Sequence, residues 1–172
     1  MNKKTTILIA VLALITLIAI SLMVWAIWFR DPVIIPPDYN TDPEDTNRIP
    51  LDSEGGDKLE TPEGGGAVGI IYTKDGISVD LSDKKISLLF GNPSRSNMDM
   101  IIQVVVRNQL IAQSGRLVPG YKLQTLDLAN GAEKKLVPGT YDAKYIVYYY
   151  DPESGEKAIL NTEIPITIQV KE

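Results

Sequence analysis

The feature that most constrains this chain is a long apolar run near its N-terminus. Residues Ile7 to Phe29 contain only two polar residues, Thr16 and Ser21, and no charged residue. A helix rises ~1.5 Å per residue and needs about 20 apolar residues to cross the hydrocarbon core of a bilayer. We therefore predict a transmembrane helix over residues 7–29, preceded by a short N-terminal segment of residues 1–6.

A cleaved secretory signal is the alternative interpretation of this run. A signal peptide has an apolar stretch of about 7–15 residues and small residues at the cleavage site. The run here is longer, and the residues from Met23 to Trp28 are mostly bulky. Trp25 and Trp28 also suit the membrane interface, where indole rings are enriched. The sequence favours an uncleaved anchor.

The basic residues predict the orientation of this anchor. Lys3 and Lys4 precede the apolar run, whereas Arg30 follows it directly beside Asp31. Basic residues are in excess on the cytoplasmic side of membrane proteins. We expect a single-pass membrane protein with a cytoplasmic N-terminus and an extracytoplasmic C-terminal domain.

Charge and composition exclude several classes of function. Residues 31–66 carry ten acidic residues against Arg48 and Lys58, whereas residues 67–172 carry twelve residues of each sign. A neutral C-terminal part gives no reason to expect a nucleic-acid partner. The chain has no histidine and no cysteine, which excludes an imidazole base, a thiol nucleophile, a disulfide and His or thiolate zinc sites. We expect no catalytic residue, no metal site and no cofactor.

The segment 30–66 has the composition of a disordered acidic linker. It holds six of the eleven prolines and five of the thirteen glycines, with few large apolar residues. Such a segment cannot bury enough apolar surface to offset its chain entropy. A flexible chain of this length averages roughly 30–36 Å end to end, so it could hold a domain away from the lipid surface or serve as a passive connection. Its acidic stretch Asp42–Asp45 matches no defined calcium loop.

From residue 67 onward, the chain has the pattern of an all-β domain. Short runs of β-branched and aromatic residues alternate with clusters of Gly, Pro, Asn and Asp, which are typical of turns. No helical period is evident, so we predict seven or eight antiparallel strands packed as a β-sandwich over residues 67–172. The candidate strands are 69–73, 77–81, 85–91, 98–108, 110–113, 122–128, 140–150 and 158–170.

The most specific motif in this domain is Leu136-Val-Pro-Gly-Thr-Tyr141. It resembles the tyrosine corner of immunoglobulin-like and fibronectin type III-like domains, in which the tyrosine hydroxyl bonds to backbone a few residues upstream. We therefore assign structural roles to Leu136, Gly139 and Tyr141. Ala143 stands where antibody domains have their second cysteine, so the resemblance implies an Ig-like sandwich without a disulfide.

The strand ending at Tyr150 supplies the candidate binding residues. If Tyr141 faces the core, alternation places Ile146, Tyr148 and Tyr150 on the opposite face as an exposed aromatic patch. Tyrosine offers a large contact area at interfaces and can stack on sugars. The alternative is that these residues only pack against neighbouring strands.

Other polar groups are weaker candidates for a site. The turn Asp151–Gly155, extended by Glu156 and Lys157, could hold a cation weakly or could be a solvated turn. A hydrolase built on Ser114 or Ser154 would lack a histidine base, and acidic residues scattered over turns offer no paired site for glycoside hydrolysis. We therefore expect a protein that is not an enzyme.

Three short motifs extend the comparison beyond the tyrosine corner. They are Ile-Ala-Gln-Ser-Gly at 111–115, Pro-Gly-Tyr at 119–121 and Tyr-Asp-Pro-Glu-Ser-Gly-Glu-Lys-Ala at 150–158. With the anchor and the acidic spacer, this stretch resembles a group of small uncharacterised surface proteins of Gram-positive bacteria. The resemblance implies a location at the cell surface, but it brings no activity and no functional residues.

The sequence as a whole favours a membrane-anchored display domain without catalytic activity. Its expected partner is another extracytoplasmic protein, with the chain acting as an accessory subunit of a cell-envelope assembly. The alternative is a module that binds cell-wall polymer (peptidoglycan or another glycan), with Tyr148 and Tyr150 as stacking platforms.

Overall fold

A computed structural model of the chain describes residues 2–28, 33–51, 57–60 and 66–172. The chain forms two compact units, Met1–Val33 and Ile34–Glu172, which we describe separately. In the first unit, α1 (Lys3–Trp28) is an apolar helix long enough to cross a membrane. The predicted helix is therefore present and begins four residues earlier than expected, while Phe29 and Arg30 lie outside the described residues.

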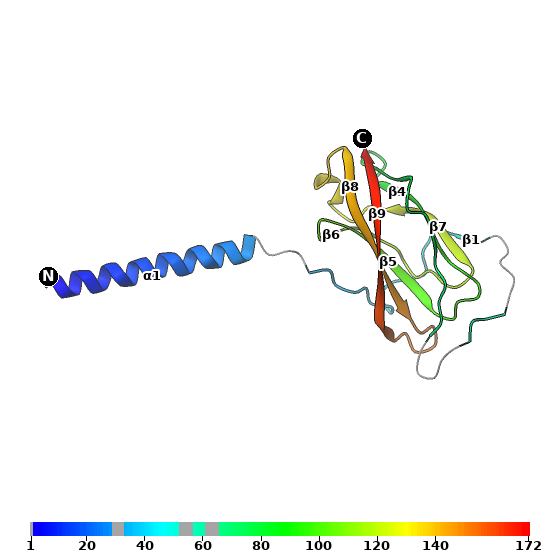
Figure 1. Ribbon diagram of the computed structural model, residues 1–172, viewed down its shortest axis with the longest axis horizontal. Coiled ribbons are helices and arrows are strands. Elements are labelled where there is room, and N and C mark those ends of the chain that lie inside the picture. Colours follow the sequence, from blue (N-terminus) through cyan, green and yellow to red (C-terminus); the bar gives the residue numbers. More distant parts are fainter. Residues whose placement is uncertain (1, 29–32, 52–56, 61–65) are drawn as a thin grey trace. The chain divides into compact units, whose positions relative to one another are not determined.

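The second unit consists mainly of β-strands (Figure 1). A strand is present at each of the eight predicted positions, which the runs of β-branched and aromatic residues between turn clusters mark correctly. One short strand and one 3-10 turn were not predicted. The elements are β1 (Arg48–Pro50), β2 (Ile71–Tyr72), β3 (Ile77–Asp80), β4 (Lys85–Asn92), β5 (Asp99–Val106), β6 (Gln109–Gln113), β7 (Tyr121–Asp127), η1 (Ala132–Lys134), β8 (Gly139–Tyr150) and β9 (Lys157–Lys171).

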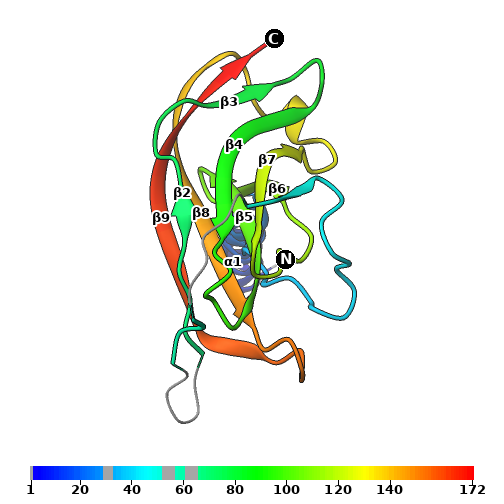
Figure 2. The same cartoon turned by 90° about the vertical axis from the view of Figure 1, so that its right-hand side faces the viewer.

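The strands form one continuous, curled sheet. Its order is β1-β7-β4-β3-β9-β8-β5-β6, and β2 pairs separately with β4. All strand pairs are antiparallel except β3 and β9, which run parallel through Ile77↔Ile168 to Asp80↔Lys171. Figure 2 shows the curl, with β8 and β9 on one side of the domain and β4 and β7 on the other.

This connected sheet differs from the predicted two-sheet sandwich. β3 pairs with β4 on one side and with β9 on the other, so it joins the two halves of the strand order into one hydrogen-bonded path. Each strand can be predicted from the residues of that strand alone. The pairing of β3 with a strand about 90 residues away cannot be predicted in this way. The domain is mostly β, as predicted, and the sheet is a half-barrel.

The concave side of the sheet holds the main apolar core. Phe90 and Tyr145 lie at its centre, with their rings edge to face at 5.5 Å between centroids. Alternate residues of β4, β5 and β8 are buried there, which fixes the register of these strands. This core includes Ile86, Leu88, Phe90, Met100, Ile102, Val104, Val106, Tyr141, Tyr145, Val147 and Tyr149.

The start of the predicted disordered linker is part of the folded domain. The second unit begins at Ile34 rather than at residue 67. β1 lies within the segment predicted to be a linker, and it pairs with β7. The carboxylate of Asp45 accepts hydrogen bonds from the amides of Asn47 and Gly115, each at 2.8 Å. The prediction of disorder differs from the structure over residues 34–51, while residues 52–56 and 61–65 lie outside the described residues.

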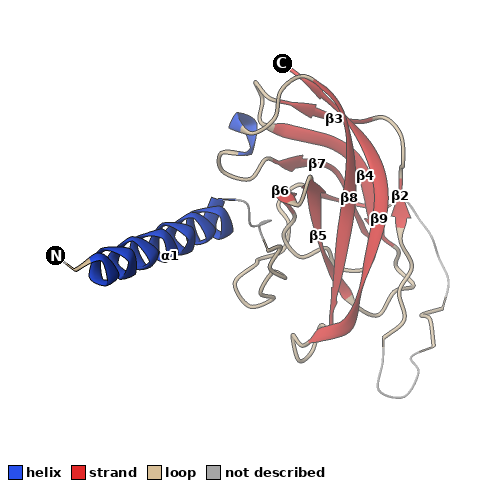
Figure 3. Cartoon of the chain, turned by 60° about the vertical axis from the view of Figure 1, so that its left-hand side comes forward, coloured by secondary structure: helices blue, strands red, loops and turns tan. Residues whose placement is uncertain are grey.

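Gly115 shows why one residue of the Ile-Ala-Gln-Ser-Gly motif is a glycine. The backbone of Pro43 and Asp45 lies so close that a Cβ at position 115 would come within 2.5 Å of the Pro43 carbonyl oxygen. Glu44 and Arg116 also form a parallel bridge at this point. The backbone of Pro43–Asp45 therefore lies in direct contact with the residues that follow β6, whose place in the domain Figure 3 shows.

Pro165 interrupts the last apolar stretch, which indicates either a bulge or a change of edge within the final strand, and the structure has no bulge at the proline. The pairing of β8 with β9 runs through Lys144↔Pro165 without a shift. The irregularity lies instead between Tyr148 and Tyr150, opposite residues 157–161. Pro165 is accommodated because β3 pairs with β9 only from Ile168 onward, which leaves the second edge of β9 without a ladder at the proline.

Candidate functional site

The predicted aromatic patch is present on one face of β8, but it is covered. Ile146, Tyr148 and Tyr150 are 4%, 4% and 2% exposed and form a second apolar cluster with Ile101 and Val105 of β5. The segment Ile34–Tyr39, here called the strap, packs on this cluster through Ile34 and Tyr39. The expectation that these three residues are exposed is therefore wrong, because a chain segment predicted to be disordered lies over them.

Side chains of the sheet donate hydrogen bonds to backbone carbonyls of the strap. The Tyr150 hydroxyl donates to the Pro37 carbonyl at 2.5 Å, and the side-chain amide Nε2 of Gln103 donates to the Ile35 carbonyl at 3.0 Å. Both donors lie on buried residues, so each bond satisfies a group that water does not reach. Burial also raises the pKa of Tyr150 to about 12, which keeps its hydroxyl protonated as a donor.

Tyr39 joins the strap to a small polar network. Its ring stacks on Tyr150 at 5.5 Å, and the Arg116 guanidinium lies 4.6 Å from its centroid. Its hydroxyl donates to Asp99 at 3.0 Å. Burial raises the pKa of Asp99, although the hydroxyl of Tyr39 and the charge of Arg116 act in the opposite direction. The arrangement fixes the strap and leaves no open space for a ligand on Tyr148 or Tyr150.

The tyrosine corner has the hydrogen bond expected of this motif. The Tyr141 hydroxyl donates to the Val137 carbonyl at 2.9 Å and accepts from the Val137 amide at 3.3 Å. Leu136 is buried, and Gly139 has φ of 152° next to the tyrosine ring. The three residues assigned structural roles therefore lie together at the start of β8 and away from the strap.

The remaining polar candidates take part in local structure. Asp151 accepts hydrogen bonds from the amides of Glu153 and Ser154 and from the Ser154 hydroxyl, and these bonds lower its pKa. The Ser114 hydroxyl accepts from the Ile102 amide at 2.9 Å between β5 and β6. In the part of the chain that the structure describes, no group of three or more acidic residues is arranged to hold a metal ion.

A surface that the sequence analysis did not identify lies at the start of β9. Ile159 is 97% exposed and Leu160 is 77% exposed. Both lie where the pairing with β8 is irregular, so neither side chain reaches the core. The signal in the sequence is the pair Ile-Leu directly after the charged turn, but such a pair equally predicts the start of a buried strand.

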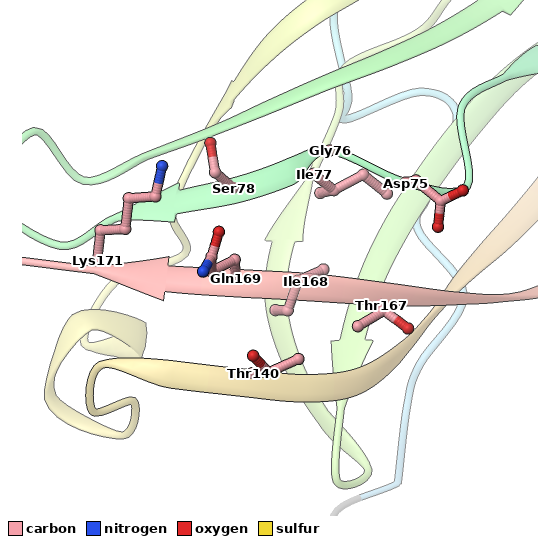
Figure 4. Close-up of a pocket in the computed structure, with 9 residues that line it drawn as sticks. All are labelled: Asp75, Gly76, Ile77, Ser78, Thr140, Thr167, Ile168, Gln169 and Lys171. Atoms are coloured by element: carbon pink, nitrogen blue, oxygen red, sulfur yellow. The ribbon is translucent and has the colours of Figure 1, made fainter.

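A shallow polar groove lies over the parallel pair β3 and β9 (Figure 4). Ser78, Thr140 and Gln169 line its middle, while Asp75 and Lys171 lie at opposite ends. Its volume is about 340 Å³. Hydroxyl and amide groups in a row can bond to a polar, uncharged chain, and the two charges mark its ends.

Comparisons with known proteins do not assign a function to any of these surfaces. No protein-family model matches the chain, and no curated protein matches it.

Proposed function

We propose that this chain is a membrane-anchored, non-catalytic binding domain that contacts another protein in the cell envelope. The observation that carries the proposal is the exposed pair Ile159 and Leu160. Exposure of two adjacent large aliphatic side chains is unfavourable by roughly 1.5–3 kcal/mol each relative to burial, and a partner that covers both would remove this cost. The domain would act as an accessory subunit of an envelope assembly.

The anchor and its flanking charges support the location. Lys3 and Lys4 lie in the first turn of α1, before its apolar stretch, which favours a cytoplasmic N-terminus and an extracytoplasmic domain. The motif resemblance to surface proteins of Gram-positive bacteria favours the same side. We propose a single-pass protein of the cell membrane on these grounds.

An Ig-like arrangement is our proposal for the finer architecture. The strand order separates into β1-β7-β4-β3 and β9-β8-β5-β6, which meet at the parallel pair. The hydrogen bond from Tyr141 lies at the turn that enters β8, where Ig-like domains have their tyrosine corner. These two observations support an Ig-like domain without a disulfide.

A photo-reactive residue at position 160 of the full chain tests the proposed function in cells. We expect a defined crosslinked protein from position 160, reduced by Ile159→Ser, and none from Asp83, which is exposed on a distant turn. Equal adducts from both positions would refute a specific contact. Turnover of an envelope polymer by the purified chain, abolished by one substitution, would instead identify an enzyme.

Binding of cell-wall polymer is the second candidate function, and the polar groove favours it. Because Tyr148 and Tyr150 lie under the strap, the hydroxyl and amide groups of Thr140 and Gln169 are better placed to meet a glycan. Pelleting of the full chain with purified peptidoglycan should then be lost in Thr140→Val plus Gln169→Leu. Absence of pelleting by the unmodified chain would exclude this function.

A further inference from the structure

One edge of β9 is largely without a strand partner. β8 pairs with β9 along one side from Lys157 to Val170. On the other side, β3 pairs only with Ile168–Lys171, and no other strand of the described residues pairs there. We call the unpaired side of residues 159–167 the open edge. β2 lies on this side of β9 (Figures 2 and 3) but pairs with β4, so the backbone groups of the open edge have no ladder partner among the described strands.

The hydrogen bonds near the C-terminus show which residues face this edge. The Lys171 carbonyl accepts from the Leu81 amide at 3.1 Å, on the β3 side. Backbone groups of a strand alternate between its two sides, so Asn161, Glu163 and Pro165 face the same side as Lys171. Pro165 has no N–H, and proline in a sheet is confined to such unpaired positions. The edge therefore offers amides at Asn161 and Glu163.

The surroundings of the open edge indicate the chemistry of an occupant. Ile159 and Leu160 lie at its start and are solvent-exposed. The neighbouring turn exposes Asp151, Glu153 and Glu156 against Lys157. An extended segment with aliphatic side chains and basic side chains complements both the apolar pair and the acidic turn.

We propose that the open edge of β9 binds an extended basic and aliphatic strand of a protein partner by β-augmentation. This inference rests on the proposed function and specifies how the partner is held. Main-chain hydrogen bonds to Asn161 and Glu163 provide affinity, and the Ile159–Leu160 pair provides specificity. Because Pro165 ends the row of amides, the pairing is short.

A second copy of this chain is a poorer occupant. In a symmetric antiparallel pair centred on Glu163, the two glutamates would lie directly opposite each other, and like charges so placed are destabilising. We therefore assign the edge to a different protein with the opposite charge.

Amide hydrogen exchange on the full chain in nanodiscs tests this assignment. The probe is a peptide of alternating Lys and Val, with two matched controls: the same peptide N-methylated at alternate amides, and a Glu-Val peptide. We expect the Lys-Val peptide to slow exchange at Asn161 and Glu163 at least tenfold. The N-methylated and acidic peptides should bind at least tenfold more weakly.

Two variants separate the backbone contribution from the charge of residue 163. Glu163→Pro removes the edge amide and should abolish binding of the Lys-Val peptide, whereas Glu163→Gln keeps the amide and should weaken it by less than tenfold. If Glu163→Pro does not fold, the N-methylated peptide still decides the role of main-chain bonds. Equal binding of the methylated and unmethylated peptides, or no binding at all, overturns the proposal.

Two further outcomes distinguish this proposal from the function on which it rests. A partner crosslinked at position 160 without protection of Asn161 and Glu163 by the basic peptide overturns β-augmentation but leaves the proposed function standing. Protection of these amides in a dimer without peptide would overturn the assignment to a different protein and give the edge to a second copy. Protection by the basic peptide without any cellular adduct would refute the protein-partner function while supporting the edge chemistry.

Discussion

Removal of a tyrosine hydroxyl should have opposite effects at two positions of β8. Tyr145 is fully buried beside Phe90, and its hydroxyl has no hydrogen-bond partner among the described residues. Tyr141 instead forms two bonds with the backbone of Val137. Tyr145→Phe and Tyr141→Phe make the same chemical change and keep the ring, so they isolate the contribution of each hydroxyl.

The expected magnitudes follow from these two environments. A buried polar group without a partner costs about 1–3 kcal/mol, so Tyr145→Phe should raise the free energy of unfolding by about 1–2 kcal/mol. A net hydrogen bond contributes about 0.5–1.5 kcal/mol, so Tyr141→Phe should lower it by about 1–2 kcal/mol. For the unit Ile34–Glu172, each kcal/mol shifts Tm by about 3 °C.

Thermal unfolding of the full chain in detergent micelles, followed by circular dichroism of the β signal, measures both shifts. We expect Tm to rise by roughly 3–6 °C for Tyr145→Phe and to fall by a similar amount for Tyr141→Phe. A lower Tm for Tyr145→Phe would refute the reasoning, because it would mean that this hydroxyl forms a stabilising bond in the core. Equal losses of Tm in the two variants would refute it for the same reason.

Three more predictions concern the strap. The folded-state pKa of Asp99 is raised above its ordinary value of 3.8, so the contribution of Asp99 to stability is largest below pH 3.8 and is lost as pH rises through the folded-state pKa. Asp99→Asn should therefore raise Tm at pH 7, and this gain should disappear near pH 3. A gain in Tm that does not depend on pH would contradict the prediction. Gly155 and Gly76 have similar φ of 71° and 78°, but a Cβ at position 155 would lie 2.8 Å from the Tyr39 ring, whereas a Cβ at position 76 would have nothing within 4 Å. Gly155→Ala should therefore lower Tm more than the control Gly76→Ala. Equal effects of the two substitutions would argue against a packed strap. Tyr150→Phe leaves the Pro37 carbonyl without its donor and should lower the free energy of unfolding, measured in urea, by about 1–2 kcal/mol. Tyr148→Phe should change it by less than about 0.5 kcal/mol. A larger loss for Tyr148→Phe than for Tyr150→Phe would refute the assigned contact.

The positions of the strands could be predicted from the sequence because alternation is a local signal. Ile86, Leu88 and Phe90 recur at every second position of β4, and apolar residues recur with the same spacing on β8 from Tyr141 to Tyr149. The joining of the sheet through β3 could not be predicted, because Ile77–Asp80 carries no mark of its two partners. The open edge could not be predicted for a related reason: Ile159 and Leu160 have the composition of a buried strand, and only the irregular pairing with β8 turns them outward.

The strap had a signal in the sequence, but it lies in the residues that the strap covers. Every residue of β5 is buried, and β5 carries Ile101 and Val105 on one face and Ile102 and Val104 on the other. A strand that is apolar on both faces must be covered on both faces. The core covers one face, and no predicted strand remained for the second. An unassigned segment with large apolar residues, Ile34 and Tyr39, covers it, although proline and acidic residues gave its surroundings the composition of a disordered linker. For single-sheet domains of this kind, an apolar outer face is thus better evidence for a covering segment than for a binding surface.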